Sequence, residues 1–462
     1  MHAPKRFRTR LDAFFNIRAS GSTVRREIGG GLTTFATMSY IVFVQPTVLS
    51  TTGMDFGSVL IATCLASAIA CVMMGLLARY PFALAPGMGE NFLFAFVLCS
   101  TFAGGMGFSW QAGLMIVLIA AVLFMLLSVF RTREKILQII PDCLKNAIGP
   151  AIGLFIAFVG LQWGGIVVSS PATMVKLGSF HTAPALLTVF GVFLIAVMTA
   201  RRIPGGILIA ILATGLLGAL TKTIPIPQES YRVSFSTFFQ LDASELIEKW
   251  DKALVAIALF FFLALFDSIG TFVGLGKQAG FIKQDEQLPR AGQAFFADAT
   301  ASFFGALFGT STLTTYIESA TGIAAGARTG LAALVTGACF LIAIPFAPLI
   351  HIAGQDIGPA FYGVSAASPH VAMYPAVAPA LIFVGFMMMA PLRRVQWEDV
   401  TESLPAFLTI ALMVFGYGIT EGIACGCIAV AVLKPAAGRA REIHPAFYFV
   451  ALTLIVRYAF LM

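Results

Sequence analysis

Charged residues are scarce in this chain, making up only 11% of its 462 residues. Soluble globular domains carry about 25% charged residues, so this chain cannot cover itself as an ordinary water-soluble enzyme does. Hydrophobic residues reach 58%, and the mean hydropathy is +0.90. At roughly 20 apolar residues for each bilayer crossing, the chain has room for about a dozen or more membrane helices. We therefore expect an all-α polytopic membrane protein.

Motifs of metal sites and hydrolytic enzymes are also missing. The seven cysteines are odd in number and lie mostly in apolar runs, which argues against a disulfide framework. Cys425 and Cys427 have no histidine or second cysteine pair nearby, and the sequence has no HExxH or GxSxG motif. The five histidines fall in loops or termini, which argues against a histidine proton relay. We expect no enzymatic activity, no metal and no cofactor.

The apolar stretches form two sets of seven. The first set lies near residues 31–50, 57–78, 84–102, 111–130, 145–168, 184–200 and 204–221. The second set lies near residues 252–273, 291–308, 311–327, 329–350, 376–391, 403–419 and 420–434. A last stretch, 446–461, is a little short for a crossing and contains Arg457, so its position relative to the membrane stays open.

This pattern divides the chain into five parts. They are a basic cytosolic arm (1–30), a first seven-helix repeat (31–221), an extramembrane amphipathic linker (222–251), a second seven-helix repeat (252–434) and a C-terminal tail (435–462) with the extra apolar segment. No small-residue cleavage site follows the short apolar patch of the arm, so we do not expect a signal peptide.

The basic residues support this division, because Lys and Arg gather in every second loop when the N-terminus is placed in the cytosol. The net charge of +7 is therefore explained by membrane orientation, and we expect no nucleic-acid partner. An odd first set of seven crossings places the second set upside down relative to the first. We predict about 14 transmembrane helices arranged as two inverted repeats, which is the layout of many secondary transporters.

Gly, Pro and hydroxyl residues interrupt the third span of each half. The first interruption reads FALAPGMGENFLFAF (82–96), and the second reads GTSTLTTYIESATGIAAGARTG (309–330). Neighbouring helices can heal a single kink, but breaks at matched positions of both halves are the best sequence sign of a binding site near the bilayer midplane. Helix N-termini and freed backbone groups at such breaks can face a polar ligand.

Acidic residues inside the spans are the second sign of a site, since each costs roughly 2.5–3.5 kcal/mol at a helix centre. They are Glu90, Asp267, Asp298, Glu318 and Glu421. Thr271 lies one turn after Asp267 on the same helix face. No Lys, Arg or His lies within a span beside Asp267 or Glu318, so a proton or a bound cation must neutralise them, as ion-coupled uptake requires. For Asp298 we favour a structural anchor, and for Glu421 a helix cap.

Several of these segments resemble the azaguanine-resistance-like branch of the nucleobase–cation symporter family, the purine permeases of the xanthine/uracil permease superfamily. The resemblance is carried by residues 30–55, 84–96, 265–280, 288–299 and 309–330, and residues 141–162 and 404–413 extend it over nearly the whole chain. It implies a multi-pass protein of the cytoplasmic membrane with intertwined repeats, a core domain and a gate domain. Spans three and ten would begin with short strands.

The resemblance also implies a site and an activity. The purine-contacting positions of the family fall on Gly89, Asn91, Asp267 and Glu318. Family members couple inward purine flux to protons, are described as moving the core against the gate like an elevator, and often form dimers. With Glu90 and Thr271 added from the residues themselves, the expected substrate-binding set is Gly89, Glu90, Asn91, Asp267, Thr271 and Glu318.

The sequence departs from the family pattern at Glu90, where an apolar residue is common, and at Gln45, which replaces a usual Asn. Glu90 could bind a different purine edge, bind the coupling cation or point into the core, and these alternatives stay open. We predict proton-coupled uptake of guanine, hypoxanthine or adenine, with Asp267, Glu318 and Glu90 as proton-coupling candidates. The alternatives are another nucleobase, xanthine or uracil, or an anion exchanger of the same fold.

Overall fold

The computed structural model describes residues 12–100, 105–129, 141–170, 172–226, 234–282, 288–362 and 372–460. These residues are mostly helical, and eight of the described helices are long and apolar enough to cross a membrane. Shorter apolar helices at Met88–Leu98, Gly206–Leu220 and Val400–Phe415 occupy further predicted spans. The chain is thus a multi-pass membrane protein, whereas the count of about 14 crossings stays a prediction.

The helices of the first half follow the predicted spans closely. They are α2 (Val24–Met38), α3 (Ile41–Ser50), α4 (Phe56–Met73), α5 (Met88–Phe92), α6 (Trp110–Val129), α8 (Asp142–Trp163), α9 (Ala183–Ala200) and α10 (Gly206–Leu220). The strand β1 (Leu84–Pro86) precedes α5, and the hairpin of β2 (Val167–Ser170) and β3 (Met174–Leu177) joins α8 to α9. Helix α4 ends in a π-helical turn at Met74–Ala78, and α5 in another at Leu93–Leu98.

The second half begins after the linker, which contains the short helix α11 (Ser244–Glu248). It consists of α12 (Trp250–Gln278), α13 (Ala291–Phe308), β4 (Leu313–Thr315), α14 (Ser319–Ala324), α15 (Gly330–Ala343), α16 (Ala347–Ala353), α17 (Gly358–Tyr362), α18 (Ala378–Met387), α19 (Val400–Phe415) and α20 (Ile419–Ala436). The last apolar stretch forms α21 (Pro445–Phe460), which packs against α20.

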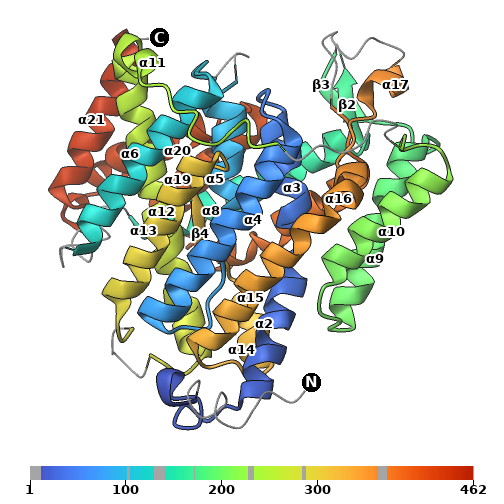
Figure 1. Ribbon diagram of the computed structural model, residues 1–462. Helices are drawn as coiled ribbons and strands as arrows, with labels where there is room; N and C mark the ends of the chain where they lie inside the picture. Colours follow the sequence, from blue (N-terminus) through green and yellow to red (C-terminus); the bar gives the residue numbers. More distant parts are fainter. Residues whose placement is uncertain are drawn as a thin grey trace.

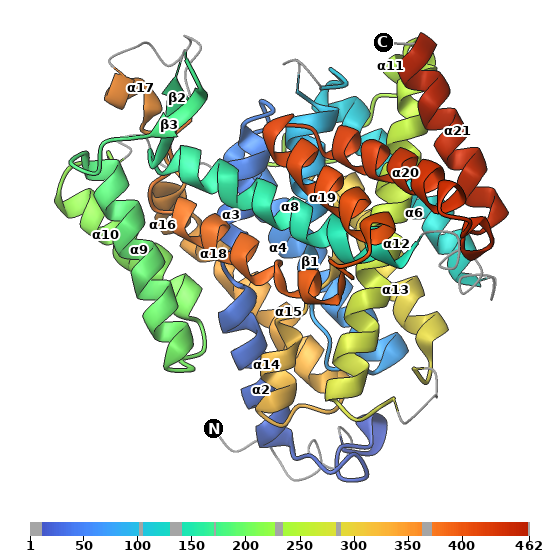
Figure 2. The ribbon, with the colours of Figure 1, turned by 180° about the vertical axis from the view of Figure 1, so that it is seen from behind.

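Helices of one half pack against helices of the other, and matching pairs of helices make matching contacts (Figures 1 and 2). Helix α4 of the first half packs on α15 of the second, and their counterparts α13 and α6 pack on each other. In the same way α9 packs on α18, and α19 packs on α8. This reciprocity is what inverted repeats produce. Two groups result: one built from α2, α4, α6 and α12 to α15, and one built from α8 to α10 and α18 to α20, which match the expected core and gate.

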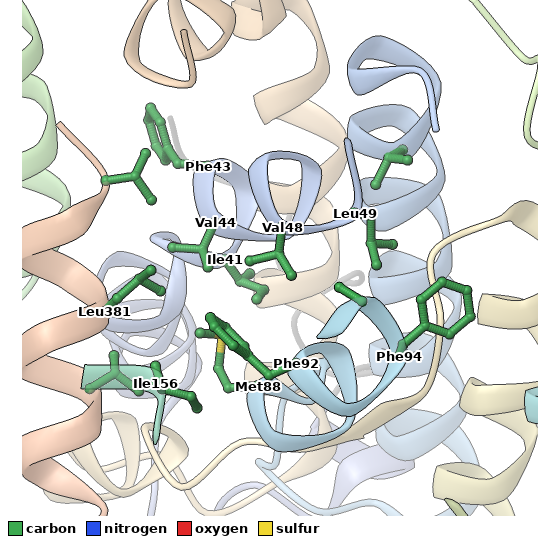
Figure 3. Close-up of a cluster of buried hydrophobic side chains, with 14 of the residues drawn as sticks. Ile41, Phe43, Val44, Val48, Leu49, Met88, Phe92, Phe94, Ile156 and Leu381 are labelled. Carbon is green, nitrogen blue, oxygen red and sulfur yellow. The ribbon is translucent and has the colours of Figure 1, made fainter. Parts of the chain in front are cut away.

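An apolar seam separates these two groups (Figure 3). Ile41, Val44 and Val48 of α3 lie against Met88 and Phe92 of α5, and Ile156 of α8 and Leu381 of α18 close the same cluster. All seven side chains are buried. Because dispersion contacts are non-directional, a seam of this composition can be re-formed at another register without leaving polar groups unpaired.

Helix α2 begins at Val24, earlier than the predicted start at residue 31, because its charged first turn has partners that hydropathy does not detect. Glu27 is buried, and its carboxylate accepts hydrogen bonds from the backbone N–H groups of Arg328 (2.9 Å) and Thr329 (3.1 Å). These groups precede α15, where the first amides of a helix have no partner within the helix. Gly31 completes the contact, since a Cβ there would lie 2.5 Å from the carbonyl oxygen of Ala332.

We expect Glu27→Ala to lower the free energy of unfolding by about 1–3 kcal/mol, because two buried amides lose their acceptor. The measurement is thermal or denaturant unfolding of the purified protein in detergent. Glu248→Ala, at an exposed glutamate of α11, is the matched control and should leave the stability unchanged. Equal stability of the two variants would contradict a role for Glu27 in joining α2 to α15.

Candidate functional site

The two interrupted spans meet as a pair of short strands. β1 and β4 are antiparallel, with Leu84 opposite Thr315, Ala85 opposite Thr314 and Pro86 opposite Leu313. The pairing extends beyond the strands, since the N–H of Gly87 donates to the carbonyl of Thr312 (3.0 Å) and that of Tyr316 to Ala83 (2.9 Å). The expectation that spans three and ten begin with short strands is confirmed. Helices α5 and α14 start directly after these strands.

Asp267 and Glu318 both lie close to β4 and to each other. The hydroxyl of Thr314 donates to Asp267 Oδ2 at 2.8 Å, and the hydroxyl of Tyr40, at the break between α2 and α3, donates to Glu318 Oε1 at 2.8 Å. Asp267 is exposed and Glu318 partly exposed, whereas β4 is buried. Both carboxylates are therefore held in place and remain reachable from outside the protein.

Open space adjoins Asp267 along α12. A Cβ built on Gly270 would meet no atom within 4 Å, and one built on Gly274 would meet only Ile317, at 3.7 Å. Residues 267, 270 and 274 recur at helical spacing and so share one face. A flat ligand can approach the backbone of α12 closely along this face.

Asp298 belongs to the same neighbourhood but has a different role. Its side chain is fully buried on α13, where it accepts hydrogen bonds from Thr315 Oγ1 (2.8 Å) and from the hydroxyl of Ser268 on α12. The prediction was that Asp298 caps or anchors its own helix, whereas its hydrogen bonds join α13 to β4 and α12.

Glu90 is folded back over the start of α5. A Cβ on Gly87, the N-cap residue, would lie 2.2 Å from Glu90 Oε2, and Glu421 of α20 lies over Gly418 in the same way. Glu90 is only 2% exposed. This position places the Glu90 side chain inside the core, and its role stays open. Glu421 lies in the first turn of α20, and its role as a helix cap stays a prediction.

Unpartnered polar atoms lie beside Glu90. Within the part of the chain that the structure describes, Glu90 Oε1 and both polar atoms of the Asn91 amide are buried without a hydrogen-bond partner. Buried polar atoms are normally paired, so these atoms indicate a place where a polar molecule binds.

The other two expected site residues lie apart from the carboxylates. Gly89 is partly exposed, and its nearest side chain is Ile152 of α8, so it lies at the apolar seam. Thr271 is 8% exposed, and among the described residues its hydroxyl forms no hydrogen bond with Asp267 or Glu318. The structure thus brings Asp267, Glu318 and the start of α5 together around β4. In the part of the chain that the structure describes, Thr271 is buried one turn after Asp267 and does not join this group through a hydrogen bond to either carboxylate.

Sequence reasoning missed Tyr40, Thr314 and Tyr316. The Tyr316 hydroxyl donates to the carbonyl of Pro86 at 2.5 Å, which fixes β4 against β1. The cluster of hydroxyl residues ahead of Glu318 was a visible signal, but their roles depend on the strand. Successive strand residues point to opposite faces, so Thr314 meets Asp267 while Thr315 meets Asp298.

The site is rich in hydrogen-bond acceptors and has no cation of its own. Among the described residues none of the salt bridges includes Glu90, Asp267, Asp298 or Glu318. The other three carboxylates are close enough to Asp267 for electrostatic repulsion. No group of three or more His, Cys, Asp or Glu side chains in the described ranges is arranged to hold a metal.

Two hollows among the described residues lie away from this site. They lie at the ends of α4, α6 and α13 and at the start of α2, and arginines line both. We nevertheless place the functional site at the β1–β4 pair, because accessible carboxylates, broken helices and unpartnered amide atoms coincide only there within the described residues.

Comparison with known proteins places this geometry in a family. The chain is 40% identical to the guanine/hypoxanthine permease PbuG of Bacillus subtilis, over 98% of this chain and 100% of that protein. It is 38% identical to the adenine permease AdeP of Escherichia coli, over 98% of this chain and 96% of that protein.

Solved structures are similar in fold alone. The transmembrane domain of the cyanobacterial bicarbonate transporter BicA gives a TM-score of 0.62 at 14% identity, over 87% of this chain and 97% of that chain. The structure of SLC26A9 gives a TM-score of 0.61 at 12% identity, over 92% of this chain and 69% of that chain. The sequence model described as "Permease family" matches residues 25–425, so this chain belongs to that permease family, whose members are transporters and not enzymes.

Proposed function

We propose that the protein takes up purine nucleobases, of the guanine, hypoxanthine and adenine class, across the cytoplasmic membrane together with a proton. The observation that carries this proposal is the pair of accessible carboxylates, Asp267 and Glu318, held beside the paired strands without a cation. The names of the relatives, which are guanine/hypoxanthine and adenine permeases, support the substrate class.

The chemistry of the site suits a purine. Each carboxylate uses one oxygen to accept a hydroxyl hydrogen bond, from Thr314 or Tyr40, and keeps a second oxygen for a ring N–H. Glu318 is our first choice for the ring contact. The open face of α12 at Gly270 and Gly274 accommodates the flat ring, and the amide of Asn91 can complete the contacts because it both donates and accepts.

The charge of the site supports the proposed proton coupling. Several carboxylates near Asp267 repel one another, so a proton on Asp267 or Glu318, or on the buried Glu90, lowers the cost of moving the site through the membrane. Transport is coupled if proton and purine each favour the state that can move, so that neither crosses alone.

The proposed movement is a displacement of the core group against the gate group, with the N-terminus in the cytosol and two chains in a dimer. The apolar seam of α3 and α5 against α8 and α18 supports this movement, because a sliding contact must not leave hydrogen bonds unmade. Gly89 lies at the seam and faces Ile152 of α8.

Anion exchange is the weaker alternative. The proteins of similar fold include a bicarbonate transporter, but the likeness extends to the fold alone. An anion site favours basic residues or bare helix N-termini, whereas here carboxylates surround the strand pair. Uptake of another nucleobase, xanthine or uracil, is the closer alternative. Competition of unlabelled nucleobases with labelled hypoxanthine distinguishes these substrates.

We expect Asp267→Ala and Glu318→Gln each to reduce uptake of labelled guanine or hypoxanthine roughly 10- to 150-fold, because a hydrogen bond to a charged group is worth about 1.5–3 kcal/mol. The measurement is initial uptake at sub-saturating purine in cells that lack their own purine uptake. Asp251→Ala, in the exposed first turn of the same helix α12, and Glu248→Gln are matched controls that should transport normally. Normal accumulation by both site variants would overturn the assignment.

Coupling to protons has its own test in proteoliposomes. We expect a pH gradient, acidic outside, to drive accumulation of hypoxanthine, and a protonophore to abolish that accumulation. Glu318→Gln or Asp267→Asn should lose the response to the pH gradient, since the carrier of the proton is removed. Accumulation that follows a sodium gradient at equal internal and external pH would contradict proton coupling.

A further inference from the structure

A hollow of about 540 Å³ lies where α4 and α6 end and α13 begins, away from the strand pair. Its lining includes Arg79 after the π-helical turn of α4, Arg290 at the N-cap of α13, Gln293, and the leucines Leu76 and Leu77. Arg79 and Arg290 both fall in predicted cytosolic loops. In Figures 1 and 2 the start of α13 lies toward the same end of the molecule as the start of α2.

Both arginines lie against aromatic rings. The guanidinium of Arg79 lies 4.8 Å from the ring centroid of Phe14, and that of Arg290 lies 5.2 Å from the ring of Tyr80. Among the described residues neither arginine is part of a salt bridge. The ring contacts therefore position the two positive charges in advance at the edge of the hollow.

Both arginines also have left-handed backbone conformations, with φ of +58° for Arg79 and +56° for Arg290. This region is unfavourable for residues with a Cβ, and such strain persists only where the surrounding structure imposes it. Arg202 shares this conformation, so the backbone alone does not single out the two arginines; what joins them is that both line the same hollow from different helices.

Apolar surface adjoins these charges. Leu76 and Leu77 are 41% and 43% exposed and lie in the same lining, directly before Arg79. A guanidinium pairs with phosphate oxygens through parallel N–H donors. Exposed leucines beside such a pair are suited to an acyl chain and serve no purpose for a free inorganic ion.

We propose that this hollow binds the phosphate of an anionic phospholipid of the inner leaflet, with Arg79 and Arg290 on the headgroup and Leu76 and Leu77 on the acyl chains. The site is separate from the purine site and does not depend on the transported substrate. The hollow lies at the end of α4 and the start of α13. Because both helices pack in the core group, the lipid would contact the core group.

Native mass spectrometry of the full chain, released from detergent after exposure to phosphatidylglycerol or phosphatidylcholine, tests this site. We expect preferential retention of phosphatidylglycerol by the wild type. Retention should fall roughly fivefold in Arg79→Gln or Arg290→Gln, because a basic residue at the membrane surface is worth about 1 kcal/mol toward an anionic lipid. The double variant should fall further. The control Arg201→Gln/Arg202→Gln removes the same charge on the same predicted side and should behave as the wild type.

Two further arms keep the result interpretable. Arg79→Lys/Arg290→Lys retains the charge but not the paired donors, so it should keep part of the preference, and its melting temperature checks that the fold is intact. Inorganic phosphate added to the same samples should not displace the lipid. Unchanged retention in the double Gln variant, or equal loss in the Arg201/Arg202 control, overturns the site. Displacement by free phosphate at lipid-equivalent concentrations overturns the assignment to lipid.

Discussion

The structure depends on one constraint: a membrane helix that is interrupted must find new partners for the backbone groups it exposes, because the bilayer offers none. Here the two interruptions satisfy each other. β1 and β4 pair in register, and the N–H groups of Gly87 and Tyr316 extend the pairing at both ends. Each break supplies backbone partners to the other, and the site is formed where the two breaks at matched positions meet.

The paired strands β1 and β4 also place the two aspartates in different surroundings. Because side chains alternate along β4, Thr314 binds the accessible Asp267 and Thr315 binds the buried Asp298. Asp298 accepts one hydrogen bond on each oxygen, from Thr315 and Ser268, and is fully buried. Two aspartates on neighbouring helices thus differ in exposure and in their partner on one strand, and a spacing of a single residue sets that difference.

The spans, the two breaks and the acidic residues could be predicted from the sequence, because hydropathy and charge are properties of local residues. Contacts made between distant segments could not. The partner of Glu318 is Tyr40, which lies at the break between α2 and α3. No Gly or Pro stands at this break to indicate it in the sequence. The early start of α2 depends on Glu27, whose carboxylate reads locally as a solvated charge and is in fact buried against the amides before α15. Such charges are compensated by backbone groups, and residue types alone do not reveal those groups.

The anchors of the strand pair all belong to one side of the apolar seam. Ser302 of α13 accepts from the N–H of Leu313 (3.2 Å) and donates to its carbonyl (2.6 Å), while Asp298, also on α13, holds Thr315. Tyr316 ties β4 to β1, and Glu318 reaches Tyr40. Among the described residues, these hydrogen bonds involve no helix of the gate group, whereas α3 and α5 meet the gate helices α8 and α18 through apolar side chains. A movement of the core group would therefore carry the site as one rigid unit, with its geometry unchanged, and would exchange only dispersion contacts along the seam. This division of polar and apolar contacts is what the proposed transport mechanism needs, since a site that changed shape during the movement would release its purine before the crossing was complete.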